Sequence, residues 1–239
     1  VQALEGFGAK TEAALLEHAQ AFTGGEGRTR LRDAEGVARA LVAHLEDQSG
    51  VGEVTVAGSY RRRRETVGDL DVLVTARAGA PVMDAFTGYA DVAEVLSRGE
   101  TRSRVRLAAG LAVDLRVVPR ASRGAALHYF TGSKAHNIAV RRRGVERGLK
   151  VNEYGVFRGE ERVAGETEEA VYASVGLAWV PPELREGRGE VEAAAAGRLP
   201  RLLTRADLRG DLHSHTHYSD GHDTLADMAR AAADLGYAY

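Results

Sequence analysis

The stretch GSYRRRRETVGDLDVLV, Gly58–Val74, places four consecutive arginines shortly before two aspartates that are separated by one residue. Its second half predicts a β-strand, in which successive side chains point to opposite faces. Leu70 and Val72 share one of these faces. Asp69 and Asp71 share the other face, about 6.5–7 Å apart along the backbone, so both carboxylates can reach a single point.

A third aspartate belongs to a second strand pattern, LAVDLRVV, Leu111–Val118. Here Val113 and Leu115 share the apolar face and Asp114 points to the opposite one. If the two strands lie side by side in one sheet, three carboxylates meet. At about 5 Å and an effective dielectric constant of about 20, each ionised pair repels by roughly 3 kcal/mol, so the cluster needs cations or a proton.

Oxygen-only ligands of this kind favour Mg²⁺ or Mn²⁺. Two such ions can activate an attacking oxygen and neutralise a leaving phosphate. The alternative interpretation is that these are ordinary acids at the edge of a strand, solvated or paired with arginines.

The turn Gly58-Ser59 follows another strand pattern, EVTVAGS, directly. Backbone N–H groups and a hydroxyl at such a turn can hold phosphate oxygens. The neighbouring arginines can bind a triphosphate bidentately. The opening stretch therefore combines a phosphate cradle with a metal cradle, which is the physical requirement of nucleotidyl transfer.

The composition is typical of a folded protein with more than one domain, since 44% of the 239 residues are hydrophobic and 28% are charged. No stretch is apolar enough to span a membrane. Without cysteine, disulfides and thiolate zinc sites are excluded, and we expect a cytoplasmic, nucleoid-associated protein. Residues 51–150 hold 18 Lys/Arg against 10 Asp/Glu, which indicates either a polyanionic partner or a solvated arginine-rich face.

The order of these patterns predicts an α+β fold with helices layered on a sheet. A helix with Asp33 as N-cap precedes the strands, and helical stretches follow them. Pro181-Pro182 breaks the chain, and the glycines at 187–189 with the alanines at 193–196 predict a tether. We interpret the chain as a fragment of a longer protein.

Two segments together resemble the family X DNA polymerases. The motif G-S-x-R-R, followed by six residues and D-x-D, resembles their nucleotidyltransferase palm, and VDLRVV supplies the expected third aspartate. Leu127–Phe157, with its Y-F-T-G-S and N-E-Y landmarks, is similar to their nucleotide-selecting segment. The resemblance covers about residues 1–180. It implies a helix-hairpin-helix segment at 1–30, a palm at 31–121, a nucleotide-selecting (thumb) subdomain at 122–185 and a linker at 186–208.

By this resemblance, Asp69 and Asp71 would bind both metal ions, and Asp114 would complete the catalytic one beside the primer 3′-hydroxyl. Two departures from the family concern the grip on the nucleotide. The family usually has glycine where this chain has Arg63, and often an acidic residue where it has Lys134.

The resemblance also implies the residues of the nucleotide and DNA sites. The triphosphate would be held by Ser59, Arg62 and Gly68. The sugar pocket would be lined by Tyr129, Phe130 and Gly132. Asn137 would face the base edge in the minor groove, and Arg141 the template strand. Gly6 and Gly8 would form the helix-hairpin-helix turn that grips DNA phosphates, for which a plain helix-capping turn is the alternative.

The tail carries a second motif, since Asp211–Gly221 resembles the opening of a PHP domain. His213 and His215 alternate on a predicted strand, and Asp220 would be a third ligand, a set that suits Zn²⁺ or Mn²⁺. Surface histidines are the alternative. Residues 209–239 would be only the start of that domain, so we expect an incomplete site and no nuclease activity in this chain. A carboxy-terminal PHP domain in the family indicates a bacterial protein with 3′–5′ exonuclease activity when full length.

The predicted function is DNA-directed DNA polymerisation on gapped or primer-template DNA, in short-gap repair. A primer 3′-oxygen would attack the α-phosphate of a dNTP and release pyrophosphate, and we expect a monomer. Two alternatives remain. One is a DNA-end-binding scaffold, against which the intact aspartates argue, and the other is a phosphoesterase whose palm only positions DNA.

Overall fold

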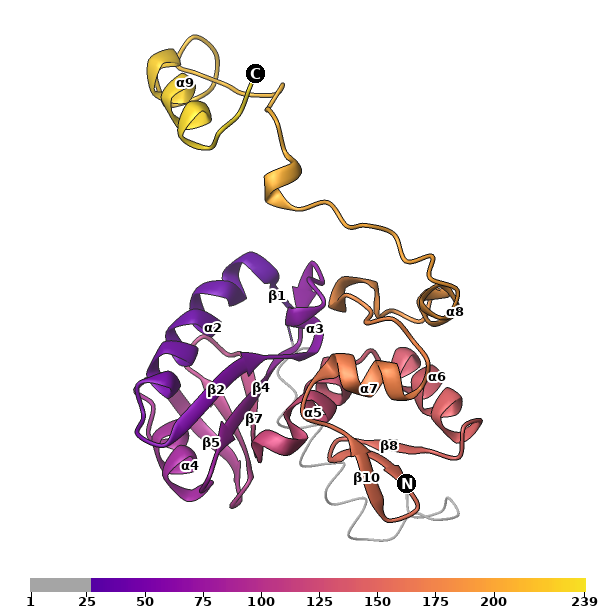
Figure 1. Ribbon diagram of the computed structural model, residues 1–239. Helices are drawn as coiled ribbons and strands as arrows, with labels where there is room; N and C mark the ends of the chain where they lie inside the picture. The colour runs from indigo at the N-terminus through magenta and orange to yellow at the C-terminus, as the bar shows by residue number, and fades with distance from the viewer. Residues whose placement is uncertain (1–26) are drawn as a thin grey trace, which may run out of the picture. The chain divides into compact units, whose positions relative to one another are not determined.

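The computed structural model describes residues 27–239, and the helix-hairpin-helix turn predicted at Gly6 and Gly8 lies outside them (Figure 1). The chain divides into two compact units, Val1–Arg198 and Leu199–Tyr239. Among the described helices, none has both the length and the apolar character needed to cross a membrane.

A five-stranded mixed sheet forms the first half of the larger unit. Its strands, in spatial order, are β2 (Val51–Val56), β4 (Asp69–Ala76), β7 (Ala112–Val118), β6 (Arg102–Leu107) and β5 (Val92–Arg98). Strands β4 and β7 are parallel, and the other neighbours are antiparallel. The two strands that carry the aspartates therefore lie side by side in the sheet, which meets the condition under which the sequence brings three carboxylates together.

One face of this sheet carries the main hydrophobic core. Leu70, Val72 and Val74 are buried there, under helices α2 (Leu31–Glu46) and α4 (Ala80–Thr87). Helix α2 buries its apolar residues at spacings of three and four, as an amphipathic helix does. It begins at Leu31 with Arg30 as N-cap, so the prediction of an N-cap at Asp33 was wrong, and this acid lies in the first turn.

The opposite face of the sheet is covered only in part. Leu73 packs there against Ala57, Ala126 and Leu127 in a smaller cluster. The covering helices are α3 (Gly58–Arg61) and α5 (Arg123–Thr131). The strand alternation predicted for β4 is thus confirmed, and it leaves Asp69 and Asp71 on this second face. A short ladder of β1 (Thr29–Arg30) and β3 (Thr66–Val67) precedes the strand.

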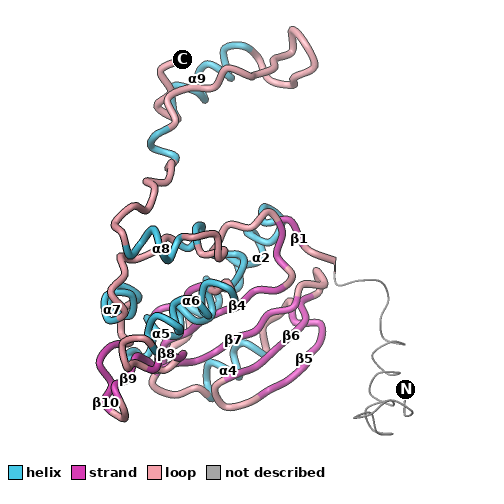
Figure 2. Tube along the Cα trace, turned by 90° about the vertical axis from the view of Figure 1, so that its right-hand side faces the viewer, coloured by secondary structure: helices cyan, strands magenta, loops and turns pink. Residues whose placement is uncertain are grey.

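The second half of the larger unit is a smaller α+β layer. Helices α5, α6 (Lys134–Val145) and α7 (Glu168–Ser174) accompany an antiparallel ladder. Its strands are β8 (Lys150–Asn152), β9 (Gly155–Arg158) and β10 (Glu161–Ala164). Figure 2 shows this ladder beside α5 and α7, both of which contact it.

The segment 186–208, predicted as a linker, contains a helix in its first part. Residues Glu190–Ala195 form helix α8, which buries Val191 and Ala194 and contacts α6. The glycines at 187–189 with the alanines at 193–196 predict a tether, but alanine is the strongest helix former, and α6 covers one side of this helix. The larger unit accordingly ends at Arg198.

Residues 199–239 form the smaller unit, whose one α-helix is α9 (Leu225–Asp234). The strand predicted for His213 and His215 is absent from this described segment, so that prediction was wrong. Backbone hydrogen bonds join Asp211 N to Tyr239 O and Ala238 N to Arg209 O, but this pairing stops short of His213, and a strand needs a hydrogen-bonded neighbour.

Candidate active site

The central strands bring the aspartates of two distant segments together. Asp71 on β4 lies opposite Asp114 on β7 in the parallel register, and Asp69 lies two residues earlier on the face of Asp71. Asp114 is buried, whereas Asp69 and Asp71 are half-buried. The three carboxylates thus gather at one end of the sheet.

The turn after β2 comes directly against this cluster. Gly58 has φ +59°, and a Cβ at this position would overlap the carboxylate of Asp71. Only glycine combines that conformation with so close an approach. Ser59 follows in the first turn of α3, so the predicted phosphate cradle lies next to the carboxylates.

The electrostatics of the cluster are those of crowded acids. Burial, together with the charges of Asp69 and Asp114, raises the pKa of Asp71 to about 7, while Arg116 and Arg62 act in the opposite direction. A carboxylate whose ionised form is this unfavourable gains from a nearby cation.

Asp114 has arginine partners on the neighbouring strand. Arg102 Nη2 lies 2.8 Å from Asp114 Oδ1, and Arg104 Nε lies 3.2 Å from Asp114 Oδ2. Arg104 also lies 4.0 Å from Asp69. Within residues 27–239, no three His, Asp or Glu side chains are positioned to coordinate one metal ion. The donor set nevertheless fits Mg²⁺ or Mn²⁺, because it consists of carboxylate oxygens that repel one another without a cation.

A cleft of about 620 Å³ extends from the aspartates to helices α5 and α6. The predicted site residues that line it are Ser59, Arg62, Asp69, Asp71, Tyr129, Phe130, Gly132, Asn137 and Arg141. The sequence placed these residues in segments more than 50 positions apart, and the fold gives them one common surface.

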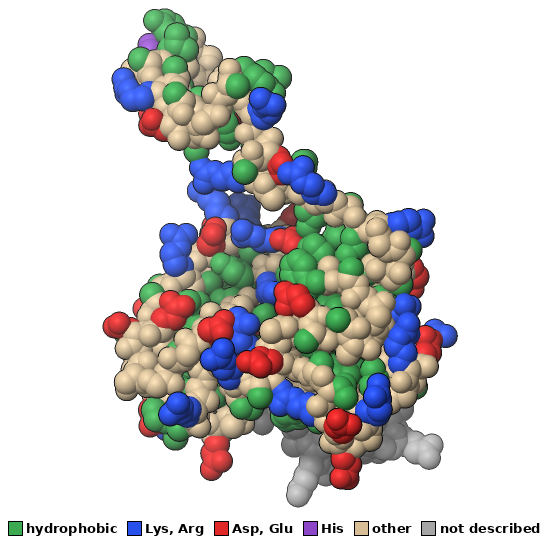
Figure 3. All heavy atoms as spheres, in the orientation of Figure 1, with side chains coloured by type: hydrophobic (Ala, Val, Ile, Leu, Met, Phe, Trp, Pro, Cys, Tyr) green, Lys and Arg blue, Asp and Glu red, His purple; other side chains and the backbone are tan. Residues whose placement is uncertain are grey.

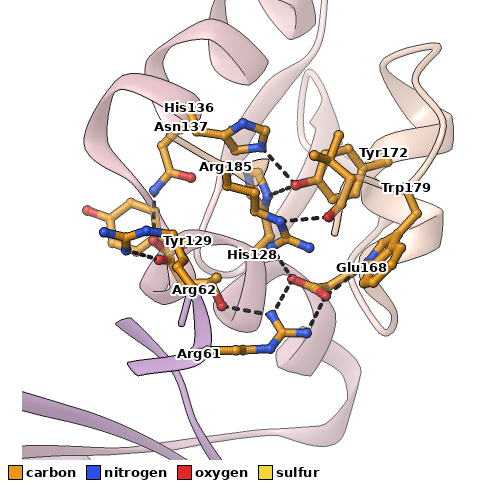
Figure 4. A network of polar contacts seen from close by, with 12 residues as sticks. Arg61, Arg62, His128, Tyr129, His136, Asn137, Glu168, Tyr172, Trp179 and Arg185 are labelled. Carbon is orange, nitrogen blue, oxygen red and sulfur yellow. Dashed lines mark hydrogen bonds and ion pairs between the residues drawn. The ribbon is translucent and has the colours of Figure 1, made fainter. Parts of the chain in front are cut away.

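Each end of the cleft is held by polar contacts (Figure 4). Arg62 donates to Thr131 O and, over 2.8 Å, to Glu186. Asn137 Nδ2 donates to Tyr129 O over 2.7 Å, and the Arg141 guanidinium lies 5.0 Å from the centre of the Tyr129 ring. The predicted triphosphate ligand and the predicted base ligand thus both contact the Y-F-T-G-S segment.

A second network joins helix α3 to helix α7 (Figure 4). Both oxygens of the Glu168 carboxylate accept hydrogen bonds from Arg61, and Arg185 and Trp179 donate to it as well. Burial opposes ionisation of this acid, but the bonds from Arg61 and Arg185 outweigh it and lower the pKa of Glu168 to about 2. Arg61 therefore holds α3 to the smaller α+β layer.

Some predicted residues lie away from the cleft. Gly68 is in the turn between β3 and β4, near the Arg28 guanidinium, and does not line it. In the smaller unit, the rings of His213 and His215 stack with their centres 5.0 Å apart, and His215 also contacts Asp220. These three side chains lie together on an exposed surface. Among the described residues of this unit, no three His, Asp or Glu side chains are arranged so that they could hold a metal ion.

Pairing of the acids with arginines was the alternative interpretation of the sequence, but the particular partners of Asp114, Arg102 and Arg104, were not named. The sequence feature that could have indicated them is the alternation in RSRVR, which places Arg102, Arg104 and Arg106 on one face of β6. On the face drawn in Figure 3, Lys and Arg side chains likewise lie among Asp and Glu side chains rather than in one continuous patch.

A sheet that gathers three carboxylates beside a glycine-serine turn has the arrangement of a nucleotidyltransferase palm. Two domain families match the chain, the DNA polymerase beta palm over residues 28–104 and the DNA polymerase beta thumb over residues 126–186. The chain belongs to the family X DNA polymerases.

Two relatives show the same likeness. The DNA polymerase/3′-5′ exonuclease PolX of Bacillus subtilis (strain 168) is 35% identical over 243 residues, which is 100% of this chain and 42% of the relative. DNA polymerase lambda of Rattus norvegicus is 28% identical over 159 residues, which is 54% of this chain and 28% of the relative. The chain thus spans less than half the length of each of these relatives.

Proposed function

We propose that this chain is the polymerase core of a bacterial repair enzyme that adds a dNTP to a primer 3′-hydroxyl in short DNA gaps. The observation that carries the proposal is the cleft with Asp69 and Asp71 at one end, Arg62 beside them, and Tyr129 and Asn137 along its wall. A nucleoside triphosphate has the matching order of groups, with phosphates that need cations at one end and a base that needs hydrogen bonds at the other.

The metal ligands in this proposal are Asp69 and Asp71 for both ions and Asp114 for the catalytic one. When bound, Mg²⁺ or Mn²⁺ would make the primer hydroxyl a better nucleophile and neutralise the leaving pyrophosphate. Asp114 accepts the proton of the hydroxyl, directly or through water. For this it must leave Arg102 or Arg104, which now neutralise it.

The nucleotide ligands follow from the walls of the cleft. The Gly58-Ser59 turn and Arg62 bind the triphosphate, which must displace Glu186 from the Arg62 guanidinium. Gly68 does not line the cleft, so the triphosphate contact proposed for it would have to come from its backbone. The sugar lies against Tyr129, Phe130 and Gly132. Asn137 contacts the base edge, and Arg141, exposed on α6, contacts the template strand.

We propose further that residues 209–239 begin a PHP-type metal domain with His213, His215 and Asp220 among its ligands for Zn²⁺ or Mn²⁺. The contacts among these three side chains support this. Three ligands do not complete a multi-metal site, so the proposal assigns no nuclease activity to this chain. The expected substrate is gapped DNA of the nucleoid, bound by a monomer.

The test compares Asp69→Asn and Asp71→Asn with the wild type on a one-nucleotide gap. Incorporation of dNTP is lost in both variants, while gel-shift affinity for the gapped DNA is unchanged or higher, because negative charge leaves the site. Variants that lose DNA binding in parallel with incorporation contradict this assignment, because the aspartates would then serve DNA binding.

A further inference from the structure

The residues at the end of the matched thumb, which ends at residue 186, and just after it return to the nucleotide cleft. We call residues 185–190 the clamp segment, since each of four contacts in it reaches an element that lines the cleft. Arg185 O accepts a hydrogen bond from Ser133 N over 2.9 Å, and Glu186 binds Arg62 over 2.8 Å. A Cβ at Gly187 would lie 2.6 Å from the Cβ of Ala135, so this glycine packs directly on the first turn of α6.

The fourth contact is made by Glu190, the first residue of α8. Its carboxylate lies 2.7 Å from His136 Nδ1, and both groups are buried. The same carboxylate accepts from Gly187 N over 2.9 Å and from Arg188 N over 2.7 Å. One acid therefore fixes both the loop of the clamp segment and the histidine on α6.

The other ring nitrogen of His136 also has a hydrogen-bond partner. His136 Nε2 lies 2.8 Å from the Tyr172 hydroxyl, and His128 Nδ1 lies 3.3 Å from the same oxygen (Figure 4). Burial, reinforced by the charge of Arg185, lowers the pKa of His128 to about 3, and burial lowers the pKa of His136 as well. Both rings are therefore neutral at neutral pH.

Neutral rings leave one consistent direction for the hydrogen bonds. The Glu190 carboxylate can only accept, so His136 carries its proton on Nδ1 and accepts at Nε2 from the Tyr172 hydroxyl. The Tyr172 oxygen in turn accepts from His128. The acid on α8 thus fixes the tautomer and orientation of a ring at the start of α6.

That start of α6 is the wall of the nucleotide cleft. His136 lies between Ser133, which caps α6 by accepting from His136 N over 3.3 Å, and Asn137, which faces the proposed base edge. A change in the position of this turn moves the Asn137 amide and the Ser133 backbone relative to the nucleotide.

We propose that the clamp segment positions the first turn of α6 for dNTP binding, with Glu190 and His136 as its positioning residues. This inference rests on the proposed polymerase function. It extends the nucleotide site past residue 186, where the matched thumb ends, to Gly187 and Glu190, which the sequence assigned to a linker. The clamp segment then acts on binding of the nucleotide, and it leaves DNA binding and the metal cluster untouched.

The test uses a matched pair of substitutions on one helix, Glu190→Gln and Glu192→Gln, in the whole 239-residue chain. The new amide at position 190 faces two backbone N–H donors and can satisfy only one of them. We expect the KM for dNTP to rise about tenfold, equivalent to about 1.4 kcal/mol. The kcat and the Kd for gapped DNA stay within twofold. Glu192 is exposed, and its variant keeps the wild-type KM.

Gly187→Ala is the second variant: its methyl group would press on Ala135, and its φ of +70° adds backbone strain at this exposed position. It should show the same rise in KM with unchanged kcat. Circular dichroism establishes that each variant is folded. Unchanged KM in both folded variants, or an equal fall of kcat in both, overturns the inference while leaving the polymerase function in place. A wild-type chain that incorporates no dNTP at all overturns the proposed function instead.

Discussion

Replacement of Asp71 by asparagine should stabilise the metal-free protein while it removes catalysis. In the folded chain the pKa of Asp71 is raised from its ordinary value of 3.8 to about 7. The folded state therefore holds a proton that the unfolded state has lost between these two pH values, and stability falls as pH rises through that window. Each pH unit of pKa shift corresponds to about 1.4 kcal/mol, so the ionised Asp71 destabilises the folded state by at most about 4 kcal/mol above pH 7. Contact with water at this half-buried side chain reduces the expected destabilisation to about 2 kcal/mol.

The assay is urea denaturation in EDTA, followed by far-UV circular dichroism at pH 8.5 and at pH 4. We expect Asp71→Asn to raise the free energy of unfolding by about 2 kcal/mol at pH 8.5 and to leave it nearly unchanged at pH 4, where the carboxyl is protonated in the folded protein. Asp47→Asn, at an exposed position, should change it by less than about 0.5 kcal/mol at either pH. Added Mg²⁺ should stabilise the wild type more than the Asp71 variant. Equal stability of the wild type and Asp71→Asn at pH 8.5 would refute the reasoning, because the ionised carboxylates would then not destabilise the metal-free protein.

Three further predictions concern single positions. Arg62→Ala should raise the KM for dNTP about tenfold and Arg64→Ala less than twofold in steady-state gap filling, since only Arg62 lines the cleft; equal effects would contradict this division. Arg63 has φ +55°, a left-handed conformation that glycine adopts without strain, so Arg63→Gly should raise the free energy of unfolding in urea by about 0.5–1 kcal/mol after the entropy cost of glycine is subtracted. A loss of stability in this variant would count against the prediction. His213→Ala should leave gap filling unchanged, and neither the wild type nor this variant should degrade DNA from the 3′ end in the presence of Mn²⁺. Nuclease activity in clean preparations would show that the domain assignment is wrong.

The centre of the fold could be read from the sequence because one strand pattern settles several questions at once. The alternation in DLDVLVTA gives both the buried face and the acidic face, and β4 begins and ends where the pattern does. Asp114 could be assigned to the same site because its own strand is apolar on the other face. The local physics of strands is enough for these conclusions.

The partners of the site could not be read in the same way, since they depend on long-range packing. Glu190 meets a histidine 54 positions earlier, and Asp114 meets arginines whose strand is adjacent only in the folded sheet. The alanine-rich stretch around Glu190 looked like a tether, because its helix becomes stable only when α6 covers it. The strand expected at His213 does not form, since the backbone pairing of Arg209 and Asp211 with Ala238 and Tyr239 does not reach it.

The most direct test of the whole account is the rate at which the 239-residue chain inserts one dNTP into a one-nucleotide gap. With Mg²⁺ or Mn²⁺ the wild type should extend the primer by one templated nucleotide and release pyrophosphate. EDTA or Asp114→Asn should abolish the extension without loss of DNA binding. A wild-type chain that binds the gapped DNA but never extends the primer with either ion, or an Asp114→Asn variant that extends it at the wild-type rate, would contradict the assignment of these carboxylates to nucleotidyl transfer.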